Sequence, residues 1–154
     1  MRITILTVGK LKSGPEFDLA DDYLDRFRKA GRQLGYRGVD IVDVDSGCGL
    51  DAEAERLLAR LPSGAHAIRL DEFGKSYRST EFSDLLVRLR DQGTPELCFL
   101  IGGAEGYGEV VKQTVPQTMA FGVQTWPHRL VRAMLAEQLY RAASIEAGLP
   151  YHKA

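Results

Sequence analysis

The chain has 154 residues, of which 44% are hydrophobic and 27% charged, and a formal net charge of -1 at pH 7. This length fits a single domain over residues 1–154. Such a domain can bury about two thirds of its unfolded surface and needs no disulfide bonds or metal ions for stability. The near-zero charge excludes the strongly basic composition of a general nucleic-acid binder but leaves a local basic face open. No apolar run is long enough for a signal peptide or a membrane span, so we expect a cytoplasmic protein that contacts neither membrane nor DNA.

The two cysteines, Cys48 and Cys98, form no CxxC pair and have no histidine at metal-ligand spacing. We therefore expect neither a disulfide framework nor a metal site. Cys98 lies in the apolar run 97–101 and is predicted to be a small core side chain.

Alternating β-branched residues predict a first strand over 1–8. The loop that follows carries Lys10 and Lys12, which suit an anionic ligand or plain solvation. Residues 16–32 have apolar positions at helical spacing, acidic residues first and basic residues last. This order complements the helix dipole, although the basic end can also touch phosphate.

The remaining elements follow in order. We expect strands at 39–44, 65–70, 97–101 and 118–122, and helices at 51–61, from Ser79 or Thr80 to near Gly93, at 109–114 and at 129–147. Residues 71–75 are expected to be a loop. This alternation predicts an α/β fold with a parallel-rich sheet and helices on both faces.

The helix 129–147 is apolar nearly all round, which predicts that it is buried on both sides. In a chain of this size the second side is most economically covered by another copy. We therefore expect a symmetric homodimer built on this helix.

Two strand-to-loop junctions lie close in sequence: 97–101 runs into the glycine-rich turn 102–108, and 118–122 runs into 123–128. Ligands of open parallel sheets bind at the carboxyl ends of the strands, so these junctions are a candidate small-molecule pocket. The alternative is ordinary turn chemistry, because glycines follow strands in any α/β protein and this spacing is not GxGxxG.

Several ordered motifs carry a more specific signal. They are Leu70-Asp71-x-x-Gly74-Lys75, Leu100-Ile101-Gly102-Gly103-x-Glu105-Gly106, Thr125-x-Pro127-His128-x-x-x-Arg132, Glu137-x-x-Tyr140-Arg141-Ala142 and Pro150-Tyr151-His152-Lys153. With Gly9-Lys10-Leu11-Lys12 and Tyr23-x-x-Arg26, they make the whole chain resemble the RlmH family, small SPOUT-class methyltransferases of the large ribosomal subunit.

The resemblance implies a C-terminal trefoil knot that binds S-adenosylmethionine, and methylation of N3 of a pseudouridine in the intersubunit stem-loop of 23S rRNA on assembled ribosomes. It places the cofactor on Leu70, Gly103, Gly122, Val123, Gln124, Thr125, Trp126 and Pro127. Many relatives have serine, lysine and methionine or leucine where this chain has Gly122, Val123 and Gln124. Backbone groups can still hold the adenine edge, whereas any contact of the missing lysine is in doubt.

The imide N3–H must lose its proton, and His152 is the first candidate for the base, with Tyr151 beside it. Their tail could close over a dimer partner's pocket; the alternative is a solvent-exposed terminus. Arg132, Arg141 and Lys153 are candidates for gripping phosphate, but Arg141 is equally suited to an ion pair with Glu137.

His128 is expected to fix its loop by hydrogen bonding to backbone. Glu105 can accept from the cofactor's ammonium group or stabilise its own turn.

Two rival functions remain. The first is a ribosome-associated binding factor with the same fold and no catalysis. The second is a nucleotide-dependent oxidoreductase, which the lack of GxGxxG after the first strand disfavours.

Overall fold

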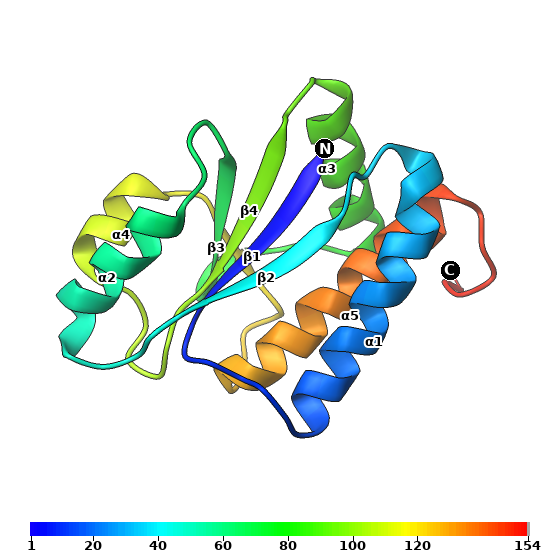
Figure 1. Cartoon of the computed structure of the whole chain (residues 1–154). Coiled ribbons are helices and arrows are strands. Elements are labelled where there is room, and N and C mark those ends of the chain that lie inside the picture. The colour runs from blue at the N-terminus through cyan, green and yellow to red at the C-terminus, as the bar shows by residue number, and fades with distance from the viewer. Residues whose placement is uncertain (154) are drawn as a thin grey trace.

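Five parallel strands form one sheet in the order β2-β1-β4-β3-β5 in the computed structural model, which describes residues 1–153 (Figure 1). The strands are β1 (Arg2–Val8), β2 (Val39–Val44), β3 (His66–Ser76), β4 (Glu96–Ile101) and β5 (Thr118–Ala120). The helices are α1 (Pro15–Gly31), the 3₁₀ helix η1 (Arg32–Leu34), α2 (Gly49–Arg60), α3 (Ser79–Asp91), α4 (Glu109–Thr114) and α5 (His128–Glu146). The predicted α/β class and parallel sheet are confirmed.

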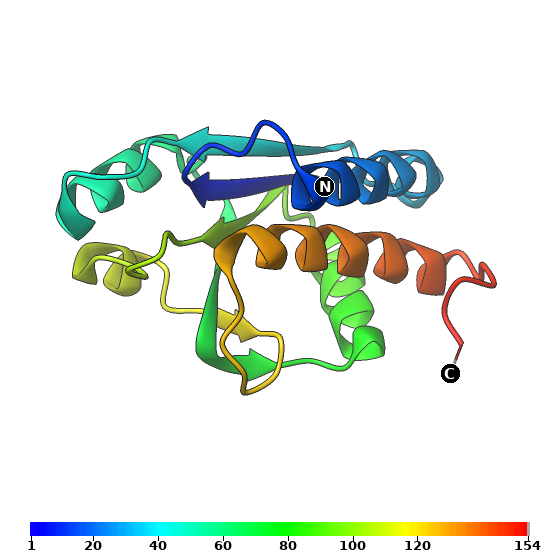
Figure 2. The same cartoon turned by 90° about the horizontal axis from the view of Figure 1, so that it is seen from below.

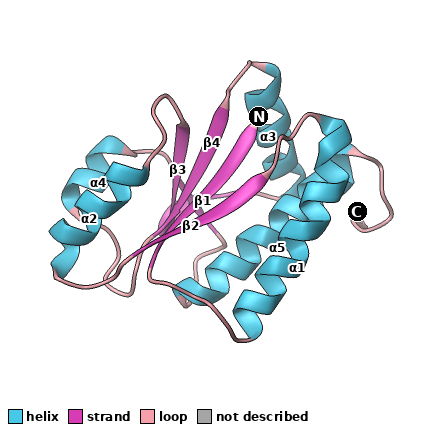
Figure 3. Ribbon diagram, in the orientation of Figure 1, coloured by secondary structure: helices cyan, strands magenta, loops and turns pink. Residues whose placement is uncertain are grey.

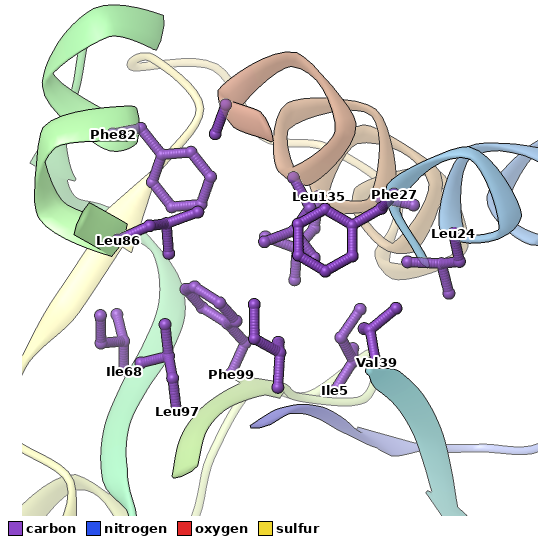
Figure 4. Close-up of a cluster of buried hydrophobic side chains, with 14 of the residues drawn as sticks. Ile5, Leu24, Phe27, Val39, Ile68, Phe82, Leu86, Leu97, Phe99 and Leu135 are labelled. Carbon is purple, nitrogen blue, oxygen red and sulfur yellow. The ribbon is translucent and has the colours of Figure 1, made fainter. Parts of the chain in front are cut away.

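Helices cover both faces of the sheet, as predicted: α1, α3 and α5 lie on one face and α2 and α4 on the other (Figure 3). Side chains alternate between these two cores along each strand, so Phe99 packs on the first side and Cys98 on the second. Around Phe99, Figure 4 shows Phe82 of α3 above the ring, with centroids 5.9 Å apart. Because both faces of β1 and β4 are buried, these strands read as nearly continuous apolar runs.

The strand β3 is longer than expected, and the predicted loop 71–75 is wrong. β3 continues to Ser76, and after a register shift Lys75 and Ser76 pair with Met119 and Ala120 of β5. Gly74 permits this pairing, since a Cβ at its position would lie 2.8 Å from the backbone of Met119. The polar segment 71–76 is thus held in the sheet by the close approach of the Gly74 backbone to the Met119 backbone.

The N-terminus of α3 also differs from the expectation. Arg78, not Ser79 or Thr80, is the N-cap residue, and its backbone N–H donates to the Glu81 carboxylate at 2.7 Å. The Ser79 hydroxyl instead donates to Gln138 of α5 at 2.9 Å. An acidic residue three positions into the helix satisfies the cap, which leaves Ser79 free to link two helices.

The helix α5 is covered on both sides, but by its own chain. It packs between α1 and α3 on the face of the sheet (Figure 2), and the chain buries or half-buries every residue from Leu130 to Glu146. Its apolar residues Val131, Met134 and Ile145 are only half-buried, so the structure leaves room for a second copy on part of this helix. The homodimer stays a prediction, and so does the C-terminal knot.

Within residues 1–153, no helix combines the length and apolar character that crossing a bilayer requires.

Candidate active site

A cavity of about 450 Å³ lies where β4 and β5 end, beside residues 70–73 of β3. Its volume is in the range of about 300–1,000 Å³ that is typical of small-molecule sites. It is lined by Leu50, Leu70, Asp71, Glu72, Phe73, Ile101, Gly102, Gly103, Ala104, Glu105, Gly106, Tyr107, Lys112, Met119, Ala120, Phe121, Gln124, Thr125, Trp126, His128 and Val131. The two predicted strand-to-loop junctions are therefore brought together in one pocket.

Tyr107 fixes the floor of this cavity. Its hydroxyl oxygen lies 2.9 Å from the carbonyl oxygen of Leu70 and 2.7 Å from that of Leu100, so the two carbonyls share its one O–H donor and β3 is linked to β4. Burial raises the pKa of this phenol above its ordinary value, so the hydroxyl keeps the proton that it donates. Tyr107 was not among the predicted site residues, and its only signal in the sequence is an aromatic residue inside a glycine-rich turn.

The buried arginine Arg69 contacts Tyr107 and so stabilises the same floor of the cavity. The Arg69 guanidinium lies 5.3 Å from the Tyr107 ring centroid, donates to the carbonyl oxygen of Val115 at 2.9 Å and pairs with Asp71 at 2.5 Å. The sequence signal for the role of Arg69 is an arginine inside an apolar strand. A charge buried there requires partners such as Asp71 and the carbonyl oxygen of Val115.

The glycine turn after β4 is tightly packed. A Cβ at Gly102 would lie 2.9 Å from the carbonyl oxygen of Gly106, and one at Gly103 would lie 3.1 Å from Cγ1 of Val8. Backbone without side chains therefore forms this wall, which lets a ligand approach the chain closely.

Five of the eight predicted cofactor residues line the cavity: Leu70, Gly103, Gln124, Thr125 and Trp126. Gly122, Val123 and Pro127 are not part of its lining, and the Val123 side chain is 95% exposed. Gly122 adopts a left-handed φ of +85° in the turn between β5 and the cavity.

Two hydrogen bonds hold this loop at the mouth of the cavity. Thr125 donates to the Glu72 carboxylate, and the Trp126 indole donates to the carbonyl oxygen of Phe121 at 3.0 Å. The mouth is therefore closed on one side by contacts between the β3 extension and the segment after β5.

A second cavity of about 250 Å³ adjoins the first at the ends of β1 and β4. It is lined by Thr7, Val8, Gly9, Lys10, Leu11, Ser46, Glu53, Ile101, Gly103, Ala104, Glu105, His128, Arg129 and Arg132. Five residues line both cavities: Ile101, Gly103, Ala104, Glu105 and His128. The two cavities therefore adjoin each other along the carboxyl edge of the sheet and share one wall.

His128 stands at the junction of the two cavities. The expected hydrogen bond from its ring to the backbone is wrong, since Nδ1 is buried and has no partner within the described chain. Burial, followed by the charges of Arg129 and Arg132, lowers the pKa of His128. The neutral imidazole is therefore favoured, because the imidazolium would add a second buried N–H donor.

Arg132 is not free to grip phosphate. Its side chain is 5% exposed and pairs with the Asp43 carboxylate at 2.9 Å. The same nitrogen donates to the Thr7 hydroxyl at 2.8 Å and to the carbonyl oxygen of Gly9 at 3.1 Å. These contacts fasten the first turn of α5 to the ends of β1 and β2, so Arg132 positions the wall of the second cavity.

Tyr151 and His152 lie at the opposite end of α5 from both cavities (Figure 2). The Tyr151 hydroxyl donates to Glu137 at 2.9 Å, and Nδ1 of His152 lies 3.2 Å from the Arg141 guanidinium. Arg141 also forms the expected ion pair with Glu137, at 2.6 Å. The structure therefore brings the tail residues together but not into the chain's own pocket.

A cofactor-sized cavity at a glycine turn, where strands of a parallel sheet end, defines an α/β protein with a small-molecule site at its sheet edge. Residues 1–152 match a family model described as a predicted SPOUT methyltransferase. The chain is 60% identical to "Ribosomal RNA large subunit methyltransferase H" of Hyphomonas neptunium, covering 100% of both proteins. The protein of the same name from Caulobacter vibrioides is 52% identical over 99% of each chain.

The chain belongs to the SPOUT methyltransferase family, and the resemblance to the RlmH family is confirmed. It is thus a methyltransferase. Among solved structures, a Legionella pneumophila methyltransferase with bound SAM is similar with a TM-score of 0.47 and 10% identity, over 95% of this chain and 66% of that one. That likeness is too weak to support an argument.

Proposed function

We propose that the chain uses S-adenosylmethionine to methylate N3 of a pseudouridine in the intersubunit stem-loop of 23S rRNA, on assembled ribosomes in the cytoplasm. The observation that carries the proposal is the 450 Å³ cavity at the sheet edge of a chain that is 60% identical, over its full length, to a relative named as a large-subunit rRNA methyltransferase. The whole chain, 1–154, acts as one domain whose C-terminal part forms the family's trefoil knot.

The residues of the larger cavity fit this cofactor. Leu70, Ile101 and Met119 offer an apolar floor for an adenine ring, and the bare backbone of Gly102 and Gly103 allows a close approach. The lining also carries the carboxylates of Asp71, Glu72 and Glu105, which suit an ammonium group, a sulfonium and ribose hydroxyls. When bound, S-adenosylmethionine supplies an electrophilic methyl group.

The protein's own contribution is orientation and proton removal. In-line displacement needs the acceptor nitrogen held about 3–3.5 Å from the methyl carbon, and such alignment alone is worth effective molarities of about 10⁵ M or more. The imide proton requires an acceptor near neutral pH, and His152 is the base in this proposal. Tyr151 holds the tail through Glu137. Within one protomer Arg141 donates to Nδ1 of His152, so in this proposal the ring leaves Arg141 when the tail covers the partner's cavity, and the freed nitrogen accepts the imide proton.

His152 has to act on a partner's pocket. His128 lines the cofactor cavity at the start of α5, whereas Arg141, which holds His152, lies thirteen residues later, about 20 Å along a helix. We therefore propose a homodimer in which the partially exposed face of α5 contributes to the interface and each tail covers the other protomer's cavity. The exposed apolar side chains of Phe73 and Val123, 90% and 95% accessible, suit a surface that a second copy covers.

Two measurements test the cofactor and the reaction. Calorimetric titration with S-adenosylmethionine should give saturable binding that Gly103→Leu abolishes. Ala59→Leu introduces the same side chain on an exposed face of α2 and should leave binding intact. Ribosomes lacking the modification should then gain one methyl group, found by mass spectrometry on N3 of pseudouridine. Methylation of another nucleotide, or equal methylation of free rRNA, would contradict the proposal.

A mixing experiment tests the shared site. His152→Ala and Gly103→Leu are each inactive as homodimers in this proposal. Random exchange makes half of the dimers mixed, each with one intact site of two, so an equal mixture should recover roughly a quarter of wild-type activity. A mixture that stays inactive while the subunits demonstrably exchange would rule out a base supplied by the partner.

A further inference from the structure

The second cavity has no role in the cofactor site described above, yet it shares a wall with it. Ile101, Gly103 and His128 separate the two spaces and line both. Any group that attacks the methyl carbon has to stand within van der Waals distance of the cofactor cavity. A cavity that opens directly onto that wall satisfies this requirement.

Its size limits what it can hold. About 250 Å³ lies below the range of about 300–1,000 Å³ typical of sites for drug-sized ligands, so a second cofactor molecule is too large. A single nucleobase with an adjoining phosphate at the open rim is the appropriate scale.

Two cations at this cavity are available to a ligand. Arg129 makes no ion pair and no hydrogen bond within residues 1–153, although it lines the cavity. Lys10 pairs with Asp45 at 3.2 Å, but both side chains are more than half exposed, and such pairs contribute little. The third cation, Arg132, is neutralised by Asp43 and only builds the wall.

The cavity also presents groups that recognise a base. One carboxylate oxygen of Glu53 accepts from the backbone N–H of Gly47 at 2.9 Å, while the other lies 3.6 Å from the position of a Cβ on Gly103. The second oxygen therefore faces the shared wall, where it can accept an N–H from a ring. Neutral His128 adds a further polar group at the same place.

We propose that the second cavity binds the acceptor nucleotide: its base lies against Glu53 and His128, and its phosphate is held by Arg129 and Lys10. The inference rests on the proposed function, in which the larger cavity holds S-adenosylmethionine. The cationic rim has a second consequence, because Arg129 and Lys10 stabilise negative charge that develops on the base as its ring N–H is lost.

The test compares three variants with the wild-type dimer, using ribosomes that lack the modification. Arg129→Gln and Lys10→Gln should each raise KM for ribosomes about tenfold or more, since each removes a charge-assisted contact to phosphate. Ser46→Trp places bulk at an exposed position on the rim and should lower methylation about a hundredfold. All three should bind S-adenosylmethionine with wild-type affinity, because none of these residues lines the cofactor cavity.

The matched control is Arg60→Gln, which makes the same charge change at an exposed position at the end of α2 that lines neither cavity. It should leave KM unchanged. Binding of Arg129→Gln to ribosomes should also depend less on salt, by roughly 0.7–0.9 in the slope of log K against log salt, as expected for one lost phosphate contact.

Three results would overturn the inference. Wild-type kinetics in all three cavity variants would show that the acceptor lies elsewhere. An equal rise of KM in Arg60→Gln would show that net charge alone causes the effect. A loss of cofactor binding in Arg129→Gln would show that the second cavity belongs to the cofactor site. Failure of the wild-type protein itself to methylate ribosomes would refute the proposed function and this inference with it, whereas an active wild type with normal variants refutes the inference alone.

Discussion

Replacing Arg132 by methionine tests whether this residue builds the site or touches the substrate. Methionine keeps an apolar stem but removes the charge that pairs with Asp43 and the donor to Thr7. Breaking a buried ion pair typically costs about 3–5 kcal/mol, because the remaining charge has no partner. Asp43 is 22% exposed, so water recovers part of that cost, and we expect a loss of about 2–3 kcal/mol.

The measurement is urea unfolding followed by circular dichroism, with a thermal melt beside it. For a chain of this size, each kcal/mol lowers Tm by about 2–4 °C, so the variant should melt roughly 5–10 °C below wild type. Arg26→Met is the control, since its pair with Asp22 is about half exposed on both sides and such surface pairs contribute little to stability.

A double-mutant cycle with Asp43→Asn isolates the pair itself. The two changes should be coupled by about 1–3 kcal/mol, as for neighbours in one hydrogen-bonded network. The reasoning fails if Arg132→Met retains wild-type unfolding free energy and loses only methylation, because that outcome describes a residue that contacts RNA.

Three further changes follow from the geometry. Tyr107→Phe removes the donor that two buried carbonyl oxygens share, so the unfolding free energy in urea titrations should fall by about 1–3 kcal/mol. Cofactor binding in calorimetry should weaken as well. Unchanged values would show that water replaces the hydroxyl. His128 has a lowered pKa, so the folded protein binds fewer protons than the unfolded chain below pH 6.5 and loses stability as pH falls toward the lowered value. In His128→Gln, Tm should therefore fall less than in wild type between pH 7 and 5, and parallel curves would contradict this. Gly74→Ala places a Cβ 2.8 Å from the β5 backbone and should lower the unfolding free energy by about 1–3 kcal/mol, measured by thermal melt. Gly64→Ala is the comparison: its Cβ meets open space but its φ is +73°, so it reports backbone strain without a clash.

Local pattern sufficed for most of the fold. The strands β1 and β4 are buried on both faces, so apolar runs marked them, and the short helix α4 was predicted with the bounds that it has. The extension of β3 was missed because its residues are polar and it pairs with only β5. What holds it is a close backbone approach at Gly74, a contact between segments distant in sequence that no local pattern reveals.

The site was predictable at the level of its loops and not of its side chains. Sheet order alone puts the ends of β3, β4 and β5 together, and five predicted residues meet there. The role of Arg132 could not be read from its place on α5, because its partners Asp43 and Thr7 come from two other strands. The same holds for the second cavity, whose cations and carboxylate come from the loop after β1, from α2 and from α5.

The departure of this chain at Gly122, Val123 and Gln124 can now be placed on the molecule. Gln124 lines the cofactor cavity, but the Val123 side chain is 95% exposed and lies outside it. Val123 therefore lies on the surface beside the cavity mouth and leaves the cavity floor as it is. Together with Phe73, which lines that mouth and is 90% exposed, it makes the rim apolar. An apolar rim is costly in water and favourable under a partner, so the substitution at 123 fits the proposed dimer better than a loss of cofactor binding.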